Sequence, residues 1–356
     1  MTGAPLSAVA DPVSAAAFGR ATLTRRAGVL LALTVGVGLL ALLAVTSGSV
    51  ALDPVDALRV LVGAQAHDPR VELLVGTVRL PRMATAACAG AALGVAGLQM
   101  QTIFRNPLAD PFSLGVSSGA SLGVALLITG VGSSFAAGLS LLGRFGTVSA
   151  AALGAAGVLT VMLVLSRGVR VPATLLIIGV MALVSLLLIW TDPQRAQQFI
   201  AWGLGSFGGT TSRDLAILFG CSAAGLVAAL LSIKPLNALL LGEAYARSMG
   251  VDVRRARVVV LVGSSLLTGV VTAFCGPIGF IGIAAPRVAR RLIGTSDHRS
   301  LLPAAALTGA CAALGCSIVS LLPGQAIPIN VITSLIGAPV VVAILLRSKS
   351  IQGVAA

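Results

Sequence analysis

Apolar stretches of about 20 residues recur along the whole chain, and this is the length that a helix needs to cross the hydrocarbon core of a bilayer. They are rich in glycine and alanine, and they lack the alternation of polar and apolar residues typical of a membrane β-barrel. The sequence therefore predicts an all-α polytopic membrane protein with about ten transmembrane helices. The stretches lie near residues 28–47, 80–103, 113–131, 146–166, 172–191, 213–233, 257–275, 277–290, 302–321 and 328–346.

The composition supports a membrane location, because 57% of the 356 residues are hydrophobic and only 10% are charged. Soluble domains carry about 25% charged residues. The formal net charge of +13 would suggest a nucleic-acid partner in a soluble chain. In a membrane protein the placement of the positive charge decides its meaning, so we expect a lipid membrane and no nucleic acid as the partner.

Most lysines and arginines fall on the inner side of the membrane when the predicted helices are threaded alternately from a cytoplasmic N-terminus. We therefore predict a multi-pass protein of the cytoplasmic membrane with both termini in the cytoplasm. The first apolar stretch is interpreted as a retained helix and not as a signal peptide, because further spans follow it. The predicted parts are an N-terminal tail at 1–27, a transmembrane domain at 28–349, a cytoplasmic loop at 234–257 and a C-terminal tail at 350–356.

Residues that bind metals or carry out catalysis are scarce in this chain. The only two histidines, His67 and His298, are far apart in the sequence, and no two cysteines form a CxxC pair. We therefore expect no metal site, and a membrane enzyme is disfavoured. The five cysteines all lie in apolar stretches, at Cys88, Cys221, Cys275, Cys311 and Cys316.

The chain has no P-loop for ATP, because neither of its lysines, Lys234 and Lys349, follows a glycine-rich GxxxxGK pattern. An ATP-driven process would need an ATPase from another chain. Ion-coupled secondary transporters carry ionisable residues at mid-membrane. None lies deep in a predicted span here, since Arg144 and Arg213 fall at predicted ends. That class of transporter is kept only as an alternative.

The segment FRNPLADPFSLGVSSGASLG, at residues 104–123, separates two apolar stretches with two prolines. Proline interrupts a helix and pushes the residue before it out of the helical conformation. The chain is therefore predicted to leave one helix near 104 and to enter the next near 113. This geometry fits an ordinary helical hairpin or a broken helix beside a transport pathway. The candidate pathway residues here are Asn106, Pro107, Asp110, Pro111, Ser117 and Ser118.

Glycines spaced four residues apart predict places where helices pack closely. Gly90 and Gly94 form one such row, and Gly115, Gly119 and Gly123 form another. Small residues at this spacing let helix backbones approach each other in a membrane. We expect most of these glycines to serve packing alone.

Four ordered blocks of the sequence closely resemble the FecCD family, the permeases of bacterial ABC importers for iron–siderophore complexes, haem and cobalamin. The resemblance covers roughly residues 28–349, nearly the whole chain. It implies the type II importer fold, a dimer of permease subunits, two ATP-binding subunits and a substrate-binding protein. It also implies that ATP and Mg bind to the partner ATPase, and that this chain binds no cofactor. The blocks are Arg79–Gly123, Leu240–Val253, Gly276–Ala310 and Ile327–Arg347.

The resemblance also implies roles for particular residues. The block LLGEAYARSMGVDV is similar to the family's ATPase-coupling loop, although a solvated basic loop is the plainer interpretation. Arg79 and Arg82 resemble arginines that meet acidic residues of the binding protein, although they could equally extend towards the membrane surface. The implied coupling residues are Gly242, Glu243, Ala246, Arg247 and Gly250.

The pathway is expected along the fifth span, whose sequence from 172 to 190 carries no charge. Its candidate lining residues are Gly179, Met181 and Ser185. The outer segment FIAWGLGSFGG, at 199–209, could be an outer gate or an interfacial tryptophan anchor.

The sequence departs from the family pattern before the last span, where Leu321 and Ala326 replace charged residues and Asn330 replaces a glycine. This departure weakens an assignment to the cobalamin branch. The predicted function is thus a permease that moves a ferric chelate, a siderophore complex or haem, by alternating access. A cobalamin importer of the same family is the alternative.

Overall fold

The computed structural model of the chain describes residues 12–48, 52–130, 144–168, 173–321 and 327–352. All regular elements in these residues are helical, and no strand occurs among them. The long helices are α1 (Pro12–Thr46), α4 (Leu80–Ile103), α5 (Val116–Thr129), α7 (Arg144–Gly168), α8 (Ala173–Ile189), α10 (Ser212–Leu231), α13 (Val253–Cys275), α14 (Ile281–Ile293), α15 (His298–Val319) and α16 (Ile329–Gln352). The short helices are α2 (Pro54–Leu61), α3 (Pro69–Leu74), α9 (Pro193–Gly203), α11 (Ile233–Leu240) and α12 (Glu243–Ser248).

The expected all-α membrane fold is confirmed. Within the described residues, five helical segments are long and apolar enough to cross a membrane, and four shorter apolar helices accompany them. The five are Thr24–Thr46, Pro69–Ile103, Ser212–Leu231, Val253–Cys275 and His298–Val319. The four shorter ones lie in α5, α7, α8 and α16. Together with α14 they correspond in order to the apolar stretches that the sequence predicts.

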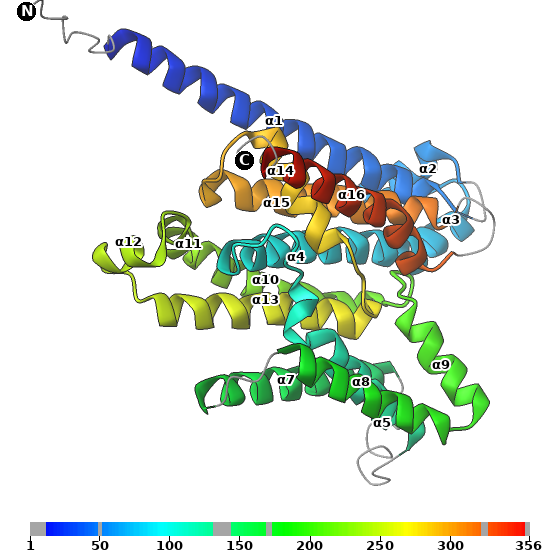
Figure 1. Cartoon of the computed structure of the whole chain (residues 1–356). Helices are drawn as coiled ribbons and strands as arrows, with labels where there is room; N and C mark the ends of the chain where they lie inside the picture. Colours follow the sequence, from blue (N-terminus) through cyan, green and yellow to red (C-terminus); the bar gives the residue numbers. More distant parts are fainter. Residues whose placement is uncertain (1–11, 49–51, 131–143, 169–172, 322–326, 353–356) are drawn as a thin grey trace, which may run out of the picture.

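The long helices run in roughly the same direction in three layers (Figure 1). The first layer holds α1, α14, α15 and α16, the middle layer α4, α10 and α13, and the third α5, α7 and α8. α4 packs against α15, α13, α14 and α10, so it is the central helix of the fold. α11 and α12 lie at one end of the molecule, and α2, α3 and α9 lie at the opposite end. We refer to these as the α12 end and the α9 end.

Glycines bring α4 and α15 into close contact. A Cβ atom added at Gly90 would meet the backbone carbonyl of Gly309, and one added at Gly94 would meet that of Ala305. The same holds between α4 and the first turn of α14, where a Cβ at Gly97 would meet the carbonyl of Gly282. The packing role predicted for the Gly90–Gly94 row is therefore confirmed.

The second glycine row divides between two roles. A Cβ atom at Gly119 or Gly123 would collide with the backbone of α7, so these two glycines form the predicted packing seam between α5 and α7. Gly115 instead adopts a left-handed conformation with φ of 78° between a 3₁₀ turn (Pro111–Leu114) and α5. Glycine is needed here for the turn, because left-handed φ values favour a residue without a side chain.

Four helical elements in the described residues begin with the same dipeptide, an aspartate followed by proline. In each case the aspartate Oδ1 accepts a hydrogen bond from the backbone N–H two residues later, and proline occupies the first helical position. This is a favourable N-cap, since the proline nitrogen needs no hydrogen-bond acceptor there. The caps are Asp53, Asp68, Asp110 and Asp192.

The second span begins earlier than the sequence predicts. The sequence predicts a span near 80–103, but helical backbone runs continuously from Pro69 to Ile103. Pro81 cannot donate a backbone hydrogen bond, and a π-helical turn at Val75–Arg79 lies just before it. Such a turn rearranges the hydrogen-bond ladder where proline removes a donor. α1 is likewise longer than the predicted stretch and begins at Pro12, inside the expected N-terminal tail.

Candidate functional site

Residues 234–257, the predicted cytoplasmic loop, contain two short helices and the start of α13. Gly242 (φ 120°) and Gly250 (φ 79°) flank α12 in conformations that favour glycine. Ala246 is fully buried in an apolar cluster with Leu239 of α11 and Val253 of α13. These three predicted coupling residues therefore shape α12 and hold it in place, and they do not present side chains at its surface.

The exposed surface of α12 combines charged and apolar side chains. Glu243 forms an ion pair with Arg257 of α13 and a second one with Arg247 at 3.8 Å. Tyr245 is 53% exposed and Met249 is 54% exposed. Sequence reasoning assigned no role to these two, although both lie in the block identified as a coupling loop. A charged rim around exposed apolar side chains is the usual composition of a protein-binding surface.

The residues from Asn106 to Asp110 form a tight turn after α4. The Asn106 Oδ1 accepts from the backbone N–H of Leu108 at 2.9 Å, and the Asp110 Oδ1 accepts from that of Phe112 at 3.0 Å. Burial raises the pKa of Asp110 to about 6, although the Phe112 hydrogen bond opposes this shift. Pro107 is exposed, whereas Pro111 is buried against Gly282 at the start of α14.

The structure confirms that the chain is interrupted between α4 and α5. α4 and α5 are separated by a turn and a 3₁₀ helix, so the chain is broken where the prolines predict. Ser118 is buried and donates to the Gly115 carbonyl at 3.0 Å, while Ser117 is half-buried. In the described conformation the face of α5 that carries small residues packs against neighbouring helices. The buried Ser118 therefore does not line an aqueous path.

Arg79 and Arg82 lie at the α9 end, but they face different neighbours. Arg79 is 5% exposed, and its guanidinium donates to the backbone carbonyls of Val45 and Ser47 at the end of α1. Arg82 is half-buried and donates to the hydroxyl of Ser317 at 3.2 Å. It also donates to the hydroxyl of Ser320 at 2.6 Å.

The three predicted residues of the fifth span, Gly179, Met181 and Ser185, are all exposed on α8. The Ser185 hydroxyl donates to the Met181 carbonyl of its own helix at 3.0 Å. α8 packs mainly against α5, so most of its circumference has no neighbour among the described residues. Among the described residues, α16 packs mainly against α14 and α15.

Asn330 joins three irregular segments at the α9 end. Its Nδ2 donates to the carbonyls of Gly203 at 3.0 Å and Pro277 at 2.5 Å, and its Oδ1 accepts from Gly279 at 3.1 Å. Asn330 is thus the residue on which α9, the α13–α14 connection and α16 converge. The departure from the family pattern at this position has a structural role, which the sequence did not reveal.

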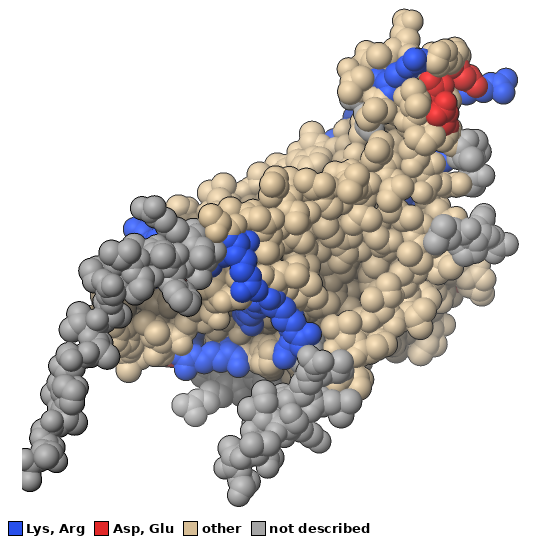
Figure 2. Space-filling view, turned by 90° about the horizontal axis from the view of Figure 1, so that it is seen from above, with Lys and Arg blue, Asp and Glu red and all other residues tan. Residues whose placement is uncertain are grey.

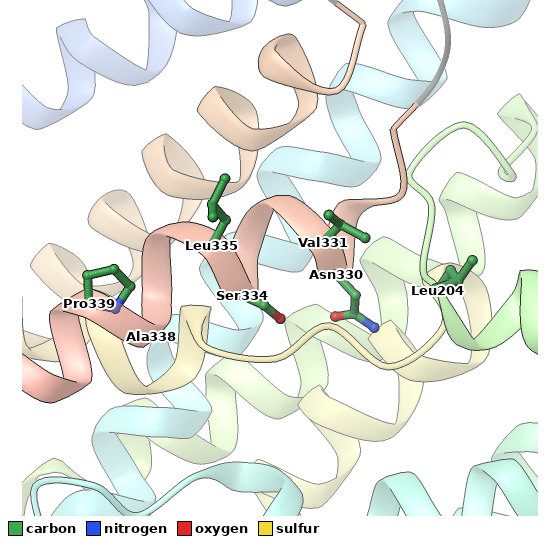
Figure 3. A pocket seen from close by; sticks show the side chains of 7 residues that line it. All are labelled: Leu204, Asn330, Val331, Ser334, Leu335, Ala338 and Pro339. Atoms are coloured by element: carbon green, nitrogen blue, oxygen red, sulfur yellow. The ribbon is translucent and has the colours of Figure 1, made fainter.

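A shallow hollow of about 730 Å³ lies beside this junction (Figure 3). Its lining is mostly apolar, and the side chains of Asn330 and Ser334 are its polar members. Leu204 contributes from the end of α9, and the other lining residues come from α16. The remaining members are Val331, Leu335, Ala338 and Pro339.

Comparisons with known proteins agree with this architecture. The sequence model of the FecCD transport family matches residues 33–347. The chain belongs to the FecCD transport family. The hemin transport system permease protein HmuU of Yersinia pestis is 38% identical over 281 residues, which cover 76% of this chain and 83% of HmuU. The vitamin B12 import system permease protein BtuC of Escherichia coli is 36% identical over 299 residues, which cover 79% of this chain and 86% of BtuC.

A solved structure shares the fold of this FecCD permease. It is described as an inward-facing conformation of a metal-chelate type ABC transporter, and it aligns with a TM-score of 0.72 at 29% identity. The alignment covers 90% of this chain and 99% of the other. The chain is therefore a permease component of an ABC importer, as the sequence predicts, and the alternative of an ion-coupled transporter is not supported.

Proposed function

We propose that this permease moves a ferric chelate, a siderophore complex or haem, into the cytoplasm. The observation that carries the proposal is its similarity to the hemin permease HmuU over most of both chains. Alternating access is the mechanism, and ATP hydrolysis on a separate subunit drives it, with ATP and Mg bound there. α8, the candidate lining helix, carries no charged residue. An uncharged lining suits a large chelate that passes with little specific binding.

The α12 end is the proposed cytoplasmic docking surface for the ATPase. α12 projects at this end with Tyr245 and Met249 exposed and with Glu243 and Arg247 beside them. Gly242, Ala246 and Gly250 give α12 its shape and hold it against α11 and α13. With this orientation both termini are cytoplasmic and the α9 end faces outward, consistent with the excess of lysine and arginine predicted inside.

The unpartnered faces of α8 and α16 are the proposed contact with a second permease subunit. Apolar side chains such as Ile178, Leu335 and Ile336 are exposed there. A second copy of the chain would cover them and would enclose a pathway between the two subunits. Gly179, Met181 and Ser185 are then the candidate lining residues, with Ser117 and Ser118 behind them. Two permeases require two ATPase subunits.

The outer α9 end is the proposed docking surface for the substrate-binding protein. Figure 2 shows acidic and basic side chains gathered at this end, over α2 and α3, and Lys and Arg gathered towards the opposite end. Arg82 is half-buried, whereas Arg79 is only 5% exposed, so we assign the direct contact to Arg82. Arg79 acts from beneath by fixing the end of α1. Charges at such a rim steer association more than they add affinity.

The test is reconstitution of the chain in liposomes with its ATPase and binding protein. Ferric siderophore, haem and cobalamin are added in turn, and ATP hydrolysis and uptake are measured. Stimulation by a ferric siderophore or haem bound to the binding protein supports the proposal. Stimulation by cobalamin alone would replace it with the function of the B12 permease BtuC, whose similarity makes it the second candidate.

A further inference from the structure

The side chain of Asn237, on α11, lies against the first turn of α15. Its Nδ2 donates to the Oδ1 of Asp297 at 2.6 Å, and its Oδ1 accepts from the backbone N–H of His298 at 2.9 Å. The orientation of the amide is therefore set by its neighbours, with the NH₂ group on the carboxylate and the oxygen on the N–H. Asp297 is also the N-cap of α15 and accepts from the backbone of Arg299.

The His298 imidazole extends this link to α4. Its Nδ1 lies 2.8 Å from the Asn237 Oδ1, which can only accept, so Nδ1 carries the hydrogen. In the neutral ring Nε2 is then an acceptor, and it lies 3.0 Å from the hydroxyl of Thr102 in the last turn of α4. The same hydroxyl lies 2.9 Å from the Leu98 carbonyl of α4, so these two acceptors share its one hydrogen. His298 is fully buried. Asn237, Asp297, His298 and Thr102 thus form one chain of hydrogen bonds, which we name the α11 link.

α11 is also the part of the proposed coupling segment that contacts the central spans. Arg105, just after α4, donates to the Leu239 carbonyl of α11 at 3.1 Å, and Ile103 packs on the apolar cluster around Leu239. α12 makes its main contacts with α11 and the start of α13. A displacement of α12 by a bound ATPase therefore reaches α4 and α15 through α11.

We propose that Asn237 is a positioning residue for transport, and that the α11 link carries the displacement of α12 to α4 and α15. α4 and α15 are packed backbone to backbone at Gly90 and Gly309, so they respond as one body. His298 and Thr102 are buried, whereas Asn237 and Asp297 are half-buried. The hydrogen bonds that join them resist shear between α11 and the two spans. This inference rests on the proposed docking of the ATPase at α12.

The test exchanges the amide of Asn237 and the carboxylate of Asp297, one position at a time and then together. Asn237→Asp places a second carboxylate against Asp297 and should lower uptake per ATP hydrolysed about tenfold in the reconstituted importer. The double variant Asn237→Asp with Asp297→Asn restores a donor to face the new carboxylate, and the amide oxygen can still cap α15. It should recover the wild-type ratio. Asp297→Asn alone should stay near wild type, because its amide oxygen keeps both hydrogen bonds.

Copurification of the ATPase separates this inference from the proposed function. If the wild-type chain binds no ATPase or moves none of the three chelates, the proposed function fails. If it does both, and Asn237→Asp retains the ATPase with a wild-type ratio, the α11 link is not the coupling path. The same conclusion follows if the double variant stays as impaired as Asn237→Asp.

A second variant keeps the test decisive where Asn237→Asp does not fold. Thr102→Val removes the hydroxyl at the α4 end of the α11 link and should lower the ratio of uptake to ATP hydrolysis. Thr268→Val is its matched control, because Thr268 is buried as Thr102 is and its hydroxyl donates to the Ser264 carbonyl of its own helix, α13, at 2.8 Å. Equal ratios in these two variants would overturn the proposal.

Discussion

Arg79 is a charged side chain that the fold has enclosed. Its guanidinium donates to the carbonyls of Val45 and Ser47 at the end of α1. The last carbonyls of an α-helix lack a partner within the helix. Replacement by methionine keeps the length but leaves the carbonyls without this donor. A buried acceptor that loses its partner costs about 1–3 kcal/mol.

We therefore expect Arg79→Met to lower the free energy of unfolding in detergent by about 1–3 kcal/mol. Arg255→Met is the control, since Arg255 forms an exposed ion pair with Asp252 at 3.1 Å. Such a surface pair contributes about 0–1 kcal/mol. Thermal unfolding of the purified chain measures both variants. Equal losses would contradict a specific role for Arg79 at the α1 end.

Asp110 gives stability a dependence on pH at the residue scale. Burial raises the pKa of its carboxyl to about 6 from an ordinary value of 3.8. The folded chain therefore holds this proton to a higher pH than the unfolded chain does, and stability falls as the pH rises between these two values. Asparagine at this position can cap the turn without ionising.

The stabilising effect of Asp110→Asn, relative to wild type, should consequently grow between about pH 4 and pH 6 and stay constant above about pH 7. Unfolding temperatures of both proteins, measured in one detergent across this range, give the difference directly. A difference that does not change with pH would show that the folded carboxyl titrates normally.

At the scale of elements, α4 depends on glycines where other backbones approach it. A Cβ atom at Gly97 would meet the carbonyl of Gly282, whereas one at Gly220 of α10 would find open space. Gly97→Ala should therefore destabilise the protein by about 1–3 kcal/mol through overpacking. Gly220→Ala should be neutral or slightly stabilising, because alanine favours a helix over glycine. Comparable losses of thermal stability in both variants would mean that the α4–α14 contact tolerates separation.

The surface of α12 makes a prediction about affinity and not about folding. Tyr245 and Met249 are exposed, and aromatic anchors at the centre of an interface commonly contribute 2 kcal/mol or more, or roughly 30-fold in Kd. Tyr245→Ala with Met249→Ala should weaken ATPase binding about 30-fold or more. Leu231→Ala is the control, because Leu231 is a 75% exposed apolar side chain at the end of α10. Retained affinity in the double variant would place the ATPase elsewhere.

The sequence predicted the spans more accurately than the elements between them. The stretch predicted at 80–103 coincides with α4, because an apolar run there ends at a proline-containing turn. α2 and α3 were not predicted, although an aspartate–proline dipeptide precedes each of them. These helices are short or amphipathic, so a search for apolar stretches passes over them.

Contacts between distant segments could not be predicted from the sequence. The acceptors for Arg79 lie 34 and 32 residues away, in a backbone whose position depends on how α1 packs. Asn330 and Asn237 each join elements that only the tertiary fold brings together. In the sequence, Asn330 is seen only as a residue that stands where the family pattern has glycine. Asn237 is seen only as one polar residue in the predicted cytoplasmic loop.

At the scale of the whole molecule, the subunit is unevenly covered. α4 and α13 have 72% of their most apolar segments buried, whereas α8 and the described part of α16 up to Val342 expose several large apolar side chains. Lipid accepts such faces as readily as a second subunit does, because bilayer chains are equally apolar. Exposure alone therefore does not distinguish a dimer contact from a lipid contact, and mutation must do so.

Truncation of a large side chain distinguishes the two environments. Ile178→Ala with Leu335→Ala should remove packing between subunits and lower the dimer fraction, because association in lipid depends on close packing. Val164→Ala on α7 is the control, since Val164 is 59% exposed, as is Ile178, on a helix of the third layer. Energy transfer between labelled chains in liposomes, measured against dilution in lipid, reports the dimer fraction. If the double variant and the control dimerise equally, the faces of α8 and α16 contact lipid, and the pathway must be enclosed by other helices.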